Sequence, residues 1–305
     1  MITRFDHQGV QWIDLESPTP DEVDQVAQEF DLTSFLSQDL LAPTVKGRVD
    51  LYPRVAYAVL HFPASRHTRG LSRSQEVDFV IGDRFMVTAH YDAVPAVYDF
   101  ARAFEAEMLL KHAATPGFGS GHILLQLAER LYGGVENELE SLEDTINAIE
   151  REIFSGNEKE MVVVISQTTR ELLHHKRTLE NHGKVLDTLE QMTIMTFGES
   201  YGNYLRGVKL FHSRVLLHAV SLMETIQELR ETNTALLSTR QNEIMKNLTI
   251  MTFITAPLAL IATLFGMSSP HVPLVGNPQS FWIIISGMLV FVAFLFGYFK
   301  YKKWL

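Results

Sequence analysis

Cysteine is absent from this chain of 305 residues. Its absence excludes disulfide scaffolds, cysteine-based zinc sites and thiol catalysis together. Positive charge is scarce as well, because 26 Lys and Arg stand against 36 Asp and Glu and leave a net charge of −10. Because the net charge is negative, we expect no nucleic-acid partner.

Catalytic motifs are also missing. The sequence contains no G-x-S-x-G, no P-loop and no HExxH, the motifs that position a nucleophile, a phosphate or a catalytic zinc. Asp14, Glu16, His61 and His67 are scattered rather than spaced as a site. We therefore expect that the protein is not an enzyme and that it holds no cofactor.

Charge itself is absent from most of the C-terminal part, since no Asp, Glu, Lys or Arg occurs from 247 to 299. Two apolar runs, 248–267 and 281–299, lie in this stretch. Each has about 20 residues and would extend roughly 30 Å as a helix, which matches the hydrocarbon core of a bilayer. The proline-rich sequence SSPHVPLVGNPQS separates them. The pattern predicts two transmembrane helices joined by a loop.

Basic residues flank these two runs. Arg240 and Lys246 precede the first run, Lys300, Lys302 and Lys303 follow the second, and the loop has none. The positive-inside rule therefore predicts that both termini are cytoplasmic. The N-terminal residues show no apolar core of signal-peptide length. We expect a multi-pass protein of the cell (inner) membrane with its soluble part in the cytoplasm.

The residues before the first run predict a long helix. No proline occurs in 203–246. A mostly apolar stripe with spacings of 4 and 3 comprises Val215, Ala219, Leu222, Ile226, Leu229, Asn233 and Leu236. Such a stripe is typical of a helix that packs along its length. Because nothing interrupts the pattern, we predict one helix from about residue 203 to about 266, bent but not ended by Pro257.

A second face of this helix consists of small or polar residues. Its members are Asn242, Met245, Thr249, Thr252, Ala256, Ala259 and Thr263. A stripe of this kind either lines a pore or packs tightly against another helix. Asn242 favours the pore, because an amide at a membrane entrance requires water or an ion. Two helices cannot enclose an aqueous path alone, so the alternatives are an oligomeric channel and a membrane anchor.

The soluble part alternates short strands with helices. We expect strands near 54–62, 76–81 and 84–90, a helix beginning near Pro20, and further helices over 95–112, 121–154 and 158–195. The last two would be long, antiparallel and joined at FSGN. The predicted division is 1–115 α/β domain, 116–202 long helices, 203–246 stalk, 247–267 first membrane helix, 268–280 loop, 281–299 second membrane helix and 300–305 basic tail.

Several stretches together resemble one known family. Residues 242–267 read NEIMKNLTIMTFITAPLALIATLFGM, and they are followed by the proline-rich loop, the second apolar run and the closing YFKYKKWL. RVDLYPRVAYAVLHF and EVDFVIGDRFMVTAHY resemble strand pairs of the same family. The chain thus resembles the CorA family of divalent-cation channels, most strongly over 240–305.

The resemblance implies an α+β cytosolic domain, a helical stalk and two transmembrane helices assembled as a homopentameric funnel in the bilayer. It implies that the partners are further copies of the chain and that divalent cations are cargo, Mg2+ foremost, with Co2+ or Ni2+ tolerated. The matching pore positions are Asn242, Met245, Leu248, Thr249, Thr252, Ala256 and Ala259, and the stripe continues to Thr263. Met245 and Leu248 would form a hydrophobic gate.

The predicted mouth departs from the family motif Gly-Met-Asn, because this chain has Gly266, Met267 and Ser268. A ring of amides could hold the waters of hydrated Mg2+, which loses its hydration shell reluctantly. A serine hydroxyl can also accept hydrogen bonds from such waters, but it sits on a shorter arm. We expect Ser268 and Asn242 to contact the hydrated ion, with weaker selection for Mg2+ or a different ion.

The loop and the stalk depart from the family as well. The loop lacks acids, and its polar candidates are Ser268, Ser269, His271, Asn277 and Gln279. Asn277 could replace the missing amide or simply form a turn. Residues 200–223 lack acids but contain Arg206, Lys209, His212, Arg214 and His218.

These departures favour the ZntB-like branch, whose members move Zn2+. Histidine is a good zinc ligand, and His174, His175 and His182 lie on one predicted helix. Single histidines on helices are more often packing residues, so we predict no structural zinc site. The alternatives to a Mg2+ channel are a ZntB-like Zn2+ transporter and a membrane-anchored scaffold that does not conduct.

Overall fold

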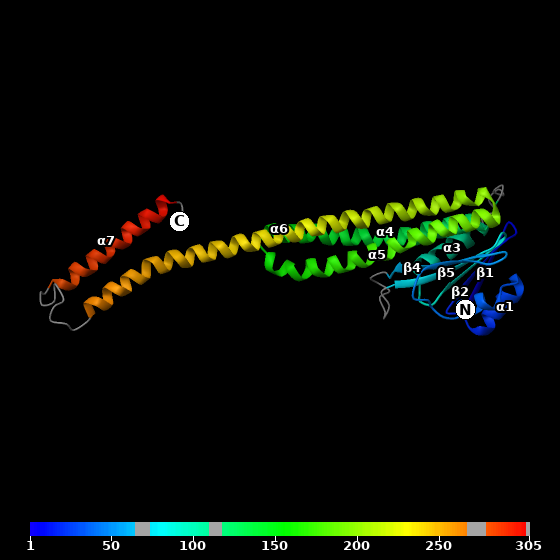
Figure 1. The fold of residues 1–305 in the computed structure, drawn as a ribbon, viewed down its shortest axis with the longest axis horizontal. Coiled ribbons are helices and arrows are strands. Elements are labelled where there is room, and N and C mark those ends of the chain that lie inside the picture. The colour runs from blue at the N-terminus through cyan, green and yellow to red at the C-terminus, as the bar shows by residue number, and fades with distance from the viewer. Residues whose placement is uncertain (65–73, 110–117, 267–278, 303–305) are drawn as a thin grey trace. The chain divides into compact units, whose positions relative to one another are not determined.

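The computed structural model describes residues 1–64, 74–109, 118–266 and 279–302 (Figure 1). The chain divides into two compact units, Met1–Arg230 and Glu231–Leu305. Helix α6 (Glu199–Gly266) contributes residues to both units. The single helix predicted over 203–266 is therefore confirmed, although it begins a few residues earlier.

The first unit contains a six-stranded mixed sheet with the order β1-β2-β6-β5-β4-β3. The strands are β1 (Ile2–His7), β2 (Val10–Glu16), β3 (Arg48–Leu51), β4 (Ala56–Pro63), β5 (Ser74–Ile81) and β6 (Phe85–His90). Neighbours are antiparallel except β2 and β6, which are parallel. The strands predicted near 54–62, 76–81 and 84–90 are confirmed as β4, β5 and β6.

Two short helices, α1 (Pro20–Phe30) and α2 (Ser34–Asp39), cover one face of the sheet. Ile13 and Leu15 of β2 belong to the core on this face, together with Val23 and Val26 of α1. Helix α1 begins at Pro20, as predicted, because Thr19 and Glu22 form a capping box.

The longer helices pack on the other face. Because side chains alternate along a strand, Trp12 points away from Ile13, and its ring lies 4.8 Å from that of Phe100 in α3 (Pro95–Leu109). Helices α4 (Ser120–Ser155) and α5 (Glu158–Phe197) lie side by side in Figure 1. The left-handed Gly156, with φ of +101°, ends α4 and permits the tight reversal into α5.

The first part of α6 also belongs to this unit. Val215, Ala219, Leu222, Ile226 and Leu229 are all buried, so the apolar seam predicted from the heptad-like spacing is confirmed over these positions. The seam explains why a helix of 68 residues remains regular before its apolar run begins.

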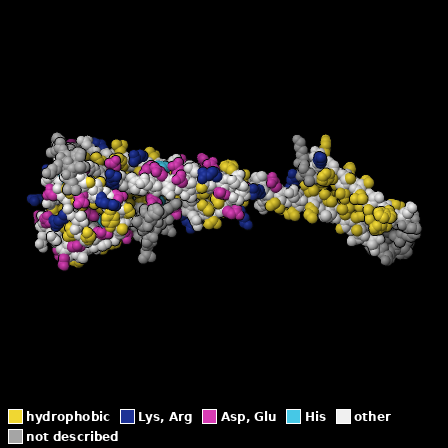
Figure 2. Space-filling model, turned by 180° about the vertical axis from the view of Figure 1, so that it is seen from behind, with side chains coloured by type: hydrophobic (Ala, Val, Ile, Leu, Met, Phe, Trp, Pro, Cys, Tyr) yellow, Lys and Arg dark blue, Asp and Glu magenta, His cyan; other side chains and the backbone are white. Residues whose placement is uncertain are grey.

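The second unit contains the remainder of α6 and helix α7 (Ser280–Tyr301). Both helices are long and apolar enough to cross a membrane, with mean hydropathy of 2.1 and 2.3 in their most apolar windows. Pro257 lies inside α6 without ending it. In Figure 2 hydrophobic side chains dominate this part of the chain, whereas charged side chains gather over the first unit.

Candidate functional site

The predicted pore stripe lies on an uncovered face of α6. Exposed positions are Asn242, Met245, Leu248, Thr252, Ala256, Ala259 and Thr263, and Thr249 is partly exposed. Met245 and Leu248, the two predicted gate residues, are 56% and 53% exposed. The described residues of the chain thus leave this face open along its whole length.

Helix α7 lies toward the opposite face of α6. Ile250 is buried, and Ile254, Leu258 and Ile261 are partly buried. Leu258 lines one pocket together with Ile285, Met288, Leu289 and Val292 of α7. At about 100° of rotation per residue this face is roughly 170° from the stripe. The second membrane helix therefore covers the back of α6 and not the stripe.

The threonine hydroxyls on the stripe bond to their own helix. Thr249 Oγ1 donates to the carbonyl of Met245 at 2.7 Å, and Thr252 Oγ1 donates to that of Leu248 at 2.9 Å. Because the single hydroxyl hydrogen is used in this way, the oxygen presents only lone pairs outward. The stripe can therefore accept hydrogen bonds, which is the capacity needed to contact the waters around a cation.

The predicted mouth is described only at its first residue. Gly266 is the last residue of α6, and a Cβ placed on it would meet no atom within 4 Å. Met267, Ser268, Ser269, His271 and Asn277 lie outside the described residues. Gln279 is exposed and stands at the N-cap of α7. The role expected of Ser268 stays a prediction.

The histidines of the first unit, Met1–Arg230, which we call the soluble unit, form hydrogen bonds with their neighbours. His182 lies against the carbonyl of His61 through Nε2 at 2.8 Å and against the Tyr132 hydroxyl through Nδ1 at 2.9 Å. Burial lowers the pKa of His182 to about 3 and also lowers the pKa of His212. His212 contacts the carbonyl of Leu179 at 2.7 Å. Both imidazoles are therefore neutral and bound to their neighbours.

The other histidines that could be zinc ligands each bond to a different partner. His175 bonds to the carbonyl of Glu171, His174 to the hydroxyl of Ser74, and His218 to carboxylates of α4. Within the described parts of the chain, no three His, Asp or Glu side chains are arranged to hold a metal ion. Lys209 is tied to Asp187 and Glu190 of α5.

A buried polar cluster on the sheet was missed by the sequence reasoning. The Glu76 carboxylate accepts the backbone N–H of Thr44 at 2.8 Å and lies 3.1 Å from His61 Nε2. Asp78 Oδ2 accepts the hydroxyl of Tyr57 at 2.9 Å. Burial, followed by the nearby Glu76 charge, raises the pKa of Asp78 to about 8. The available signal was the pair of acids in EVDFVI, a strand that is otherwise apolar.

Comparisons with known proteins agree with this architecture. A model of the family described as CorA-like Mg2+ transporter protein matches residues 7–302. The cobalt/magnesium transport protein CorA of Thermotoga maritima is 24% identical over 296 residues, which cover 93% of this chain and 80% of that protein.

Solved structures show the same fold. The complete CorA magnesium transporter of Methanocaldococcus jannaschii superimposes with a TM-score of 0.83 at 19% identity, covering 99% of this chain and 93% of that one. The ZntB cytoplasmic domain of Vibrio parahaemolyticus gives 0.60 at 13% identity, covering 77% and 90%. Since the family model spans nearly the entire chain, this chain belongs to the family of CorA-like Mg2+ transporter proteins.

Proposed function

We propose that this protein carries divalent cations across a membrane, Mg2+ foremost and Co2+ or Ni2+ as well, through a pore lined by the stripe on α6. The observation that carries the proposal is the arrangement of the second unit. The polar stripe is open, and α7 lies on the opposite side of α6. A helix that faces water on one side and a second apolar helix on the other is suited to the inner wall of a pore.

The chemistry of the stripe fits a hydrated cation. Mg2+ holds its waters tightly and prefers oxygen ligands. The lone pairs of Thr249 and Thr252 and the amide of Asn242 can accept hydrogen bonds from those waters. Met245 and Leu248 would form an apolar ring that closes the path by excluding water. Ser268 would contact the hydrated ion at the outer mouth, beside Gly266 and Met267.

A pore of this kind requires several copies of the chain. One α6 cannot enclose a path, and its uncovered stripe leaves room for neighbouring copies. The glycine at position 266 also fits several copies. No described atom of its own chain would clash with a side chain there, so a neighbouring copy can be the reason for the small residue. A homopentamer, as the family resemblance implies, would place five α6 helices around the axis and α7 toward lipid, with both termini cytoplasmic.

A ZntB-like Zn2+ transporter is the second candidate. The residue at 268 favours it, because serine replaces the amide expected at a Mg2+-selective mouth. The histidines do not add support, since His182 and His212 are bound within the soluble unit. The two candidates therefore differ in the residue expected at the mouth of the pore and in the driving force for transport.

Proteoliposome flux tests the proposal. Purified full-length chain would be assayed with Mg2+, Co2+, Ni2+ and Zn2+, with and without a pH gradient. We expect Mg2+ flux that follows the membrane potential and needs no pH gradient. Zn2+ flux without Mg2+ flux would favour the second candidate, and no flux of any cation would indicate a non-conducting scaffold.

Oligomeric state provides an independent check. In mild detergent we expect size-exclusion chromatography with light scattering to give a stable oligomer, with a mass of five chains. A stable monomer would contradict the channel. Asn242→Ala should alter conduction without dissociating the oligomer, whereas dissociation with unchanged flux per oligomer would indicate that the stripe serves packing.

A further inference from the structure

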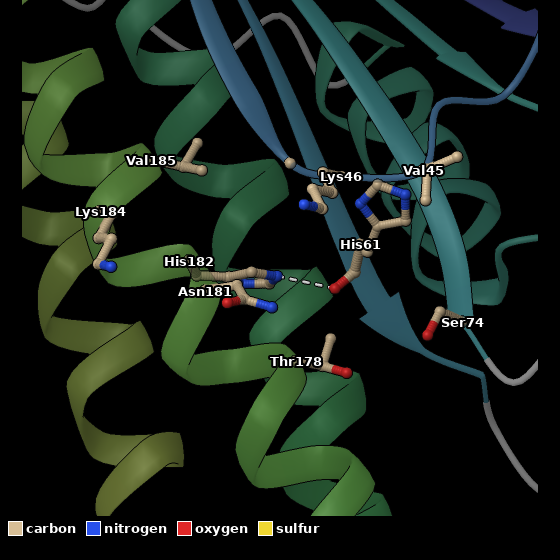
Figure 3. Close-up of a pocket in the computed structure, with 10 residues that line it drawn as sticks. Val45, Lys46, His61, Ser74, Thr178, Asn181, His182, Lys184 and Val185 are labelled. Carbon is tan, nitrogen blue, oxygen red and sulfur yellow. Dashed lines mark hydrogen bonds between the residues drawn. The ribbon is translucent and has the colours of Figure 1, made fainter.

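A pocket of the soluble unit lies at the open edge of the sheet. It has a volume of about 420 Å3 and is lined by residues of 45–47, of β4 and β5, and of α5 (Figure 3). Strand β3 pairs with β4 only between Ala56 and Val59. The end of β4 therefore has no β3 neighbour, and α5 packs beside it. The pocket is distinct from the stripe on α6.

The lining is basic and lacks acids. Its residues are Val45, Lys46, Gly47, His61, Ser74, Thr178, Asn181, His182, Lys184 and Val185. Two lysines therefore line this pocket in a chain whose net charge is −10. Within the described residues neither Lys46 nor Lys184 has a carboxylate within 4 Å. Both charges remain available to a ligand, and the acid Glu76 lies behind the lining, 3.1 Å from Nε2 of His61.

His61 adds a third cationic group. Its Nε2 lies 3.1 Å from Glu76 and 3.0 Å from the carbonyl of Thr44. The hydrogen bond to Glu76 is the main cause that raises the pKa of His61. When the ring is protonated, Nε2–H is held by these acceptors, and Nδ1–H is left to donate. Figure 3 shows the ring beside Lys46.

The walls are held in place by packing. A Cβ on Gly47 would lie 2.9 Å from the carbonyl oxygen of Val59 and 3.4 Å from Cγ2 of Val185. The backbone next to Lys46 is thus pressed against both β4 and α5. His182, buried and bonded to the carbonyl of His61, forms a fixed floor. Only the long lysine side chains have to become ordered when a ligand binds.

We propose that this pocket binds a soluble anion that contains a pyrophosphate group. Lys46, Lys184, His61, Asn181 and Thr178 line a cavity whose volume is typical of small-molecule sites. A ligand with several negative oxygens engages such separated donors at once, whereas a single carboxylate would leave most of them unused. No Phe, Tyr or Trp lines the described pocket, so the phosphates and not a base would be recognised.

Isothermal titration of the full-length chain in detergent, without divalent cations, tests this proposal with inorganic pyrophosphate as the probe. We expect saturable binding of one pyrophosphate per chain. Lys46→Gln and Lys184→Gln should each weaken binding about tenfold, and Asn181→Glu should abolish it. Lys159→Gln is the matched control, because Lys159 is exposed on the same helix α5 and does not line the pocket.

Three outcomes would overturn the proposal. The wild-type chain could show no saturable binding. Lys159→Gln could weaken binding as much as the pocket variants do, which would indicate general charge attraction. Dihexanoyl phosphatidic acid could bind while pyrophosphate does not, which would indicate a lipid headgroup site. Circular dichroism of each variant would confirm that its helical content is unchanged.

Discussion

The two parts of helix α6 have the same backbone but different surroundings. In the part that belongs to the first unit, Val215, Ala219 and Ile226 have no exposed surface. In the part that belongs to the second unit, Met251 and Leu260 are 63% and 60% exposed. Exposed apolar surface on this scale requires lipid or another chain. The first part therefore finds its packing partners within one chain, and the second finds them outside it.

The largest expected effect tests the buried part of this comparison. Val215→Asp would place a carboxylate where the side chain is fully buried. An uncompensated buried charge destabilises a protein by about 3–5 kcal/mol. We expect Val215→Asp to lower the unfolding temperature of the full-length chain strongly or to prevent folding, as measured by differential scanning fluorimetry.

The matched control is the same substitution at an exposed valine. Val163 of α5 is 60% exposed, and exposed substitutions usually change stability by less than about 0.5 kcal/mol. Val163→Asp should therefore unfold near the wild-type temperature. Equal losses of stability in both variants would show that Val215 is no more sensitive to a buried charge than an exposed valine.

A second prediction concerns the pH dependence of the soluble unit. The pKa of His182 is lowered to about 3, below the usual 6.5, because the ring is buried. Below pH 6.5 His182 is protonated in the unfolded chain but stays neutral in the folded chain. The free energy of unfolding therefore decreases as the pH is lowered. His182 alone should reduce the free energy of unfolding by about 2 kcal/mol between pH 7 and pH 5.

Other histidines shift stability in both directions, so a variant is needed to isolate this effect. His212, whose pKa is also lowered, acts in the same direction as His182. His61 and His90 have raised pKa values and act in the opposite direction, because their contribution is complete below pH 6.5 and disappears as pH rises through the folded pKa. His182→Gln should flatten the pH dependence of unfolding by about 2 kcal/mol. An unchanged slope would contradict a neutral buried His182.

A third prediction tests whether the second part of α6 faces water. Thr252 lies within the stripe and Thr255 at its edge, about 60° away, and both hydroxyls donate to a backbone carbonyl at 2.9 Å. Thr252→Val removes an acceptor from the proposed pore wall and should reduce Mg2+ flux in proteoliposomes by about fivefold, because one lost hydrogen bond contributes about 1 kcal/mol. Thr255→Val, at the edge of the stripe, should reduce flux less. Equal effects of the two variants would contradict the assigned face.

Periodicity made much of the fold predictable. The helix over 199–266, the antiparallel pair α4 and α5 and the strands β4 to β6 all follow from apolar spacing and turn residues. The strand order did not follow, because pairing β2 in parallel with β6 depends on contacts between distant parts of the chain. The bonding of His182 to the carbonyl of His61 likewise joins residues 121 positions apart, and helical spacing cannot reveal it.

The candidate site was predictable to a similar extent. The 3 and 4 spacing identified the stripe from Asn242 to Thr263, but left open whether it lines a pore or packs. Helix α7 lies beside Leu258, on the face of α6 opposite the stripe. The stripe is therefore uncovered in one chain, which favours a pore lining over packing against α7. The cluster of Glu76 and Asp78 was missed because two acids in a strand normally indicate an exposed face, whereas here tyrosine and threonine donors hold them inside.

The smallest expected effect concerns the mouth, where the pore stripe ends. Ser268→Asn would restore an amide, which extends further toward the axis and has both a carbonyl and an NH2 group to hold the waters of a hydrated ion. One improved hydrogen bond of about 0.7 kcal/mol would raise the Mg2+ over Zn2+ flux ratio about threefold. Ser269→Asn is the matched control, one residue further along, and should leave the ratio unchanged. An unchanged ratio in Ser268→Asn would show that position 268 does not contact the ion, and selection would then have to occur deeper, at Asn242 or Thr249.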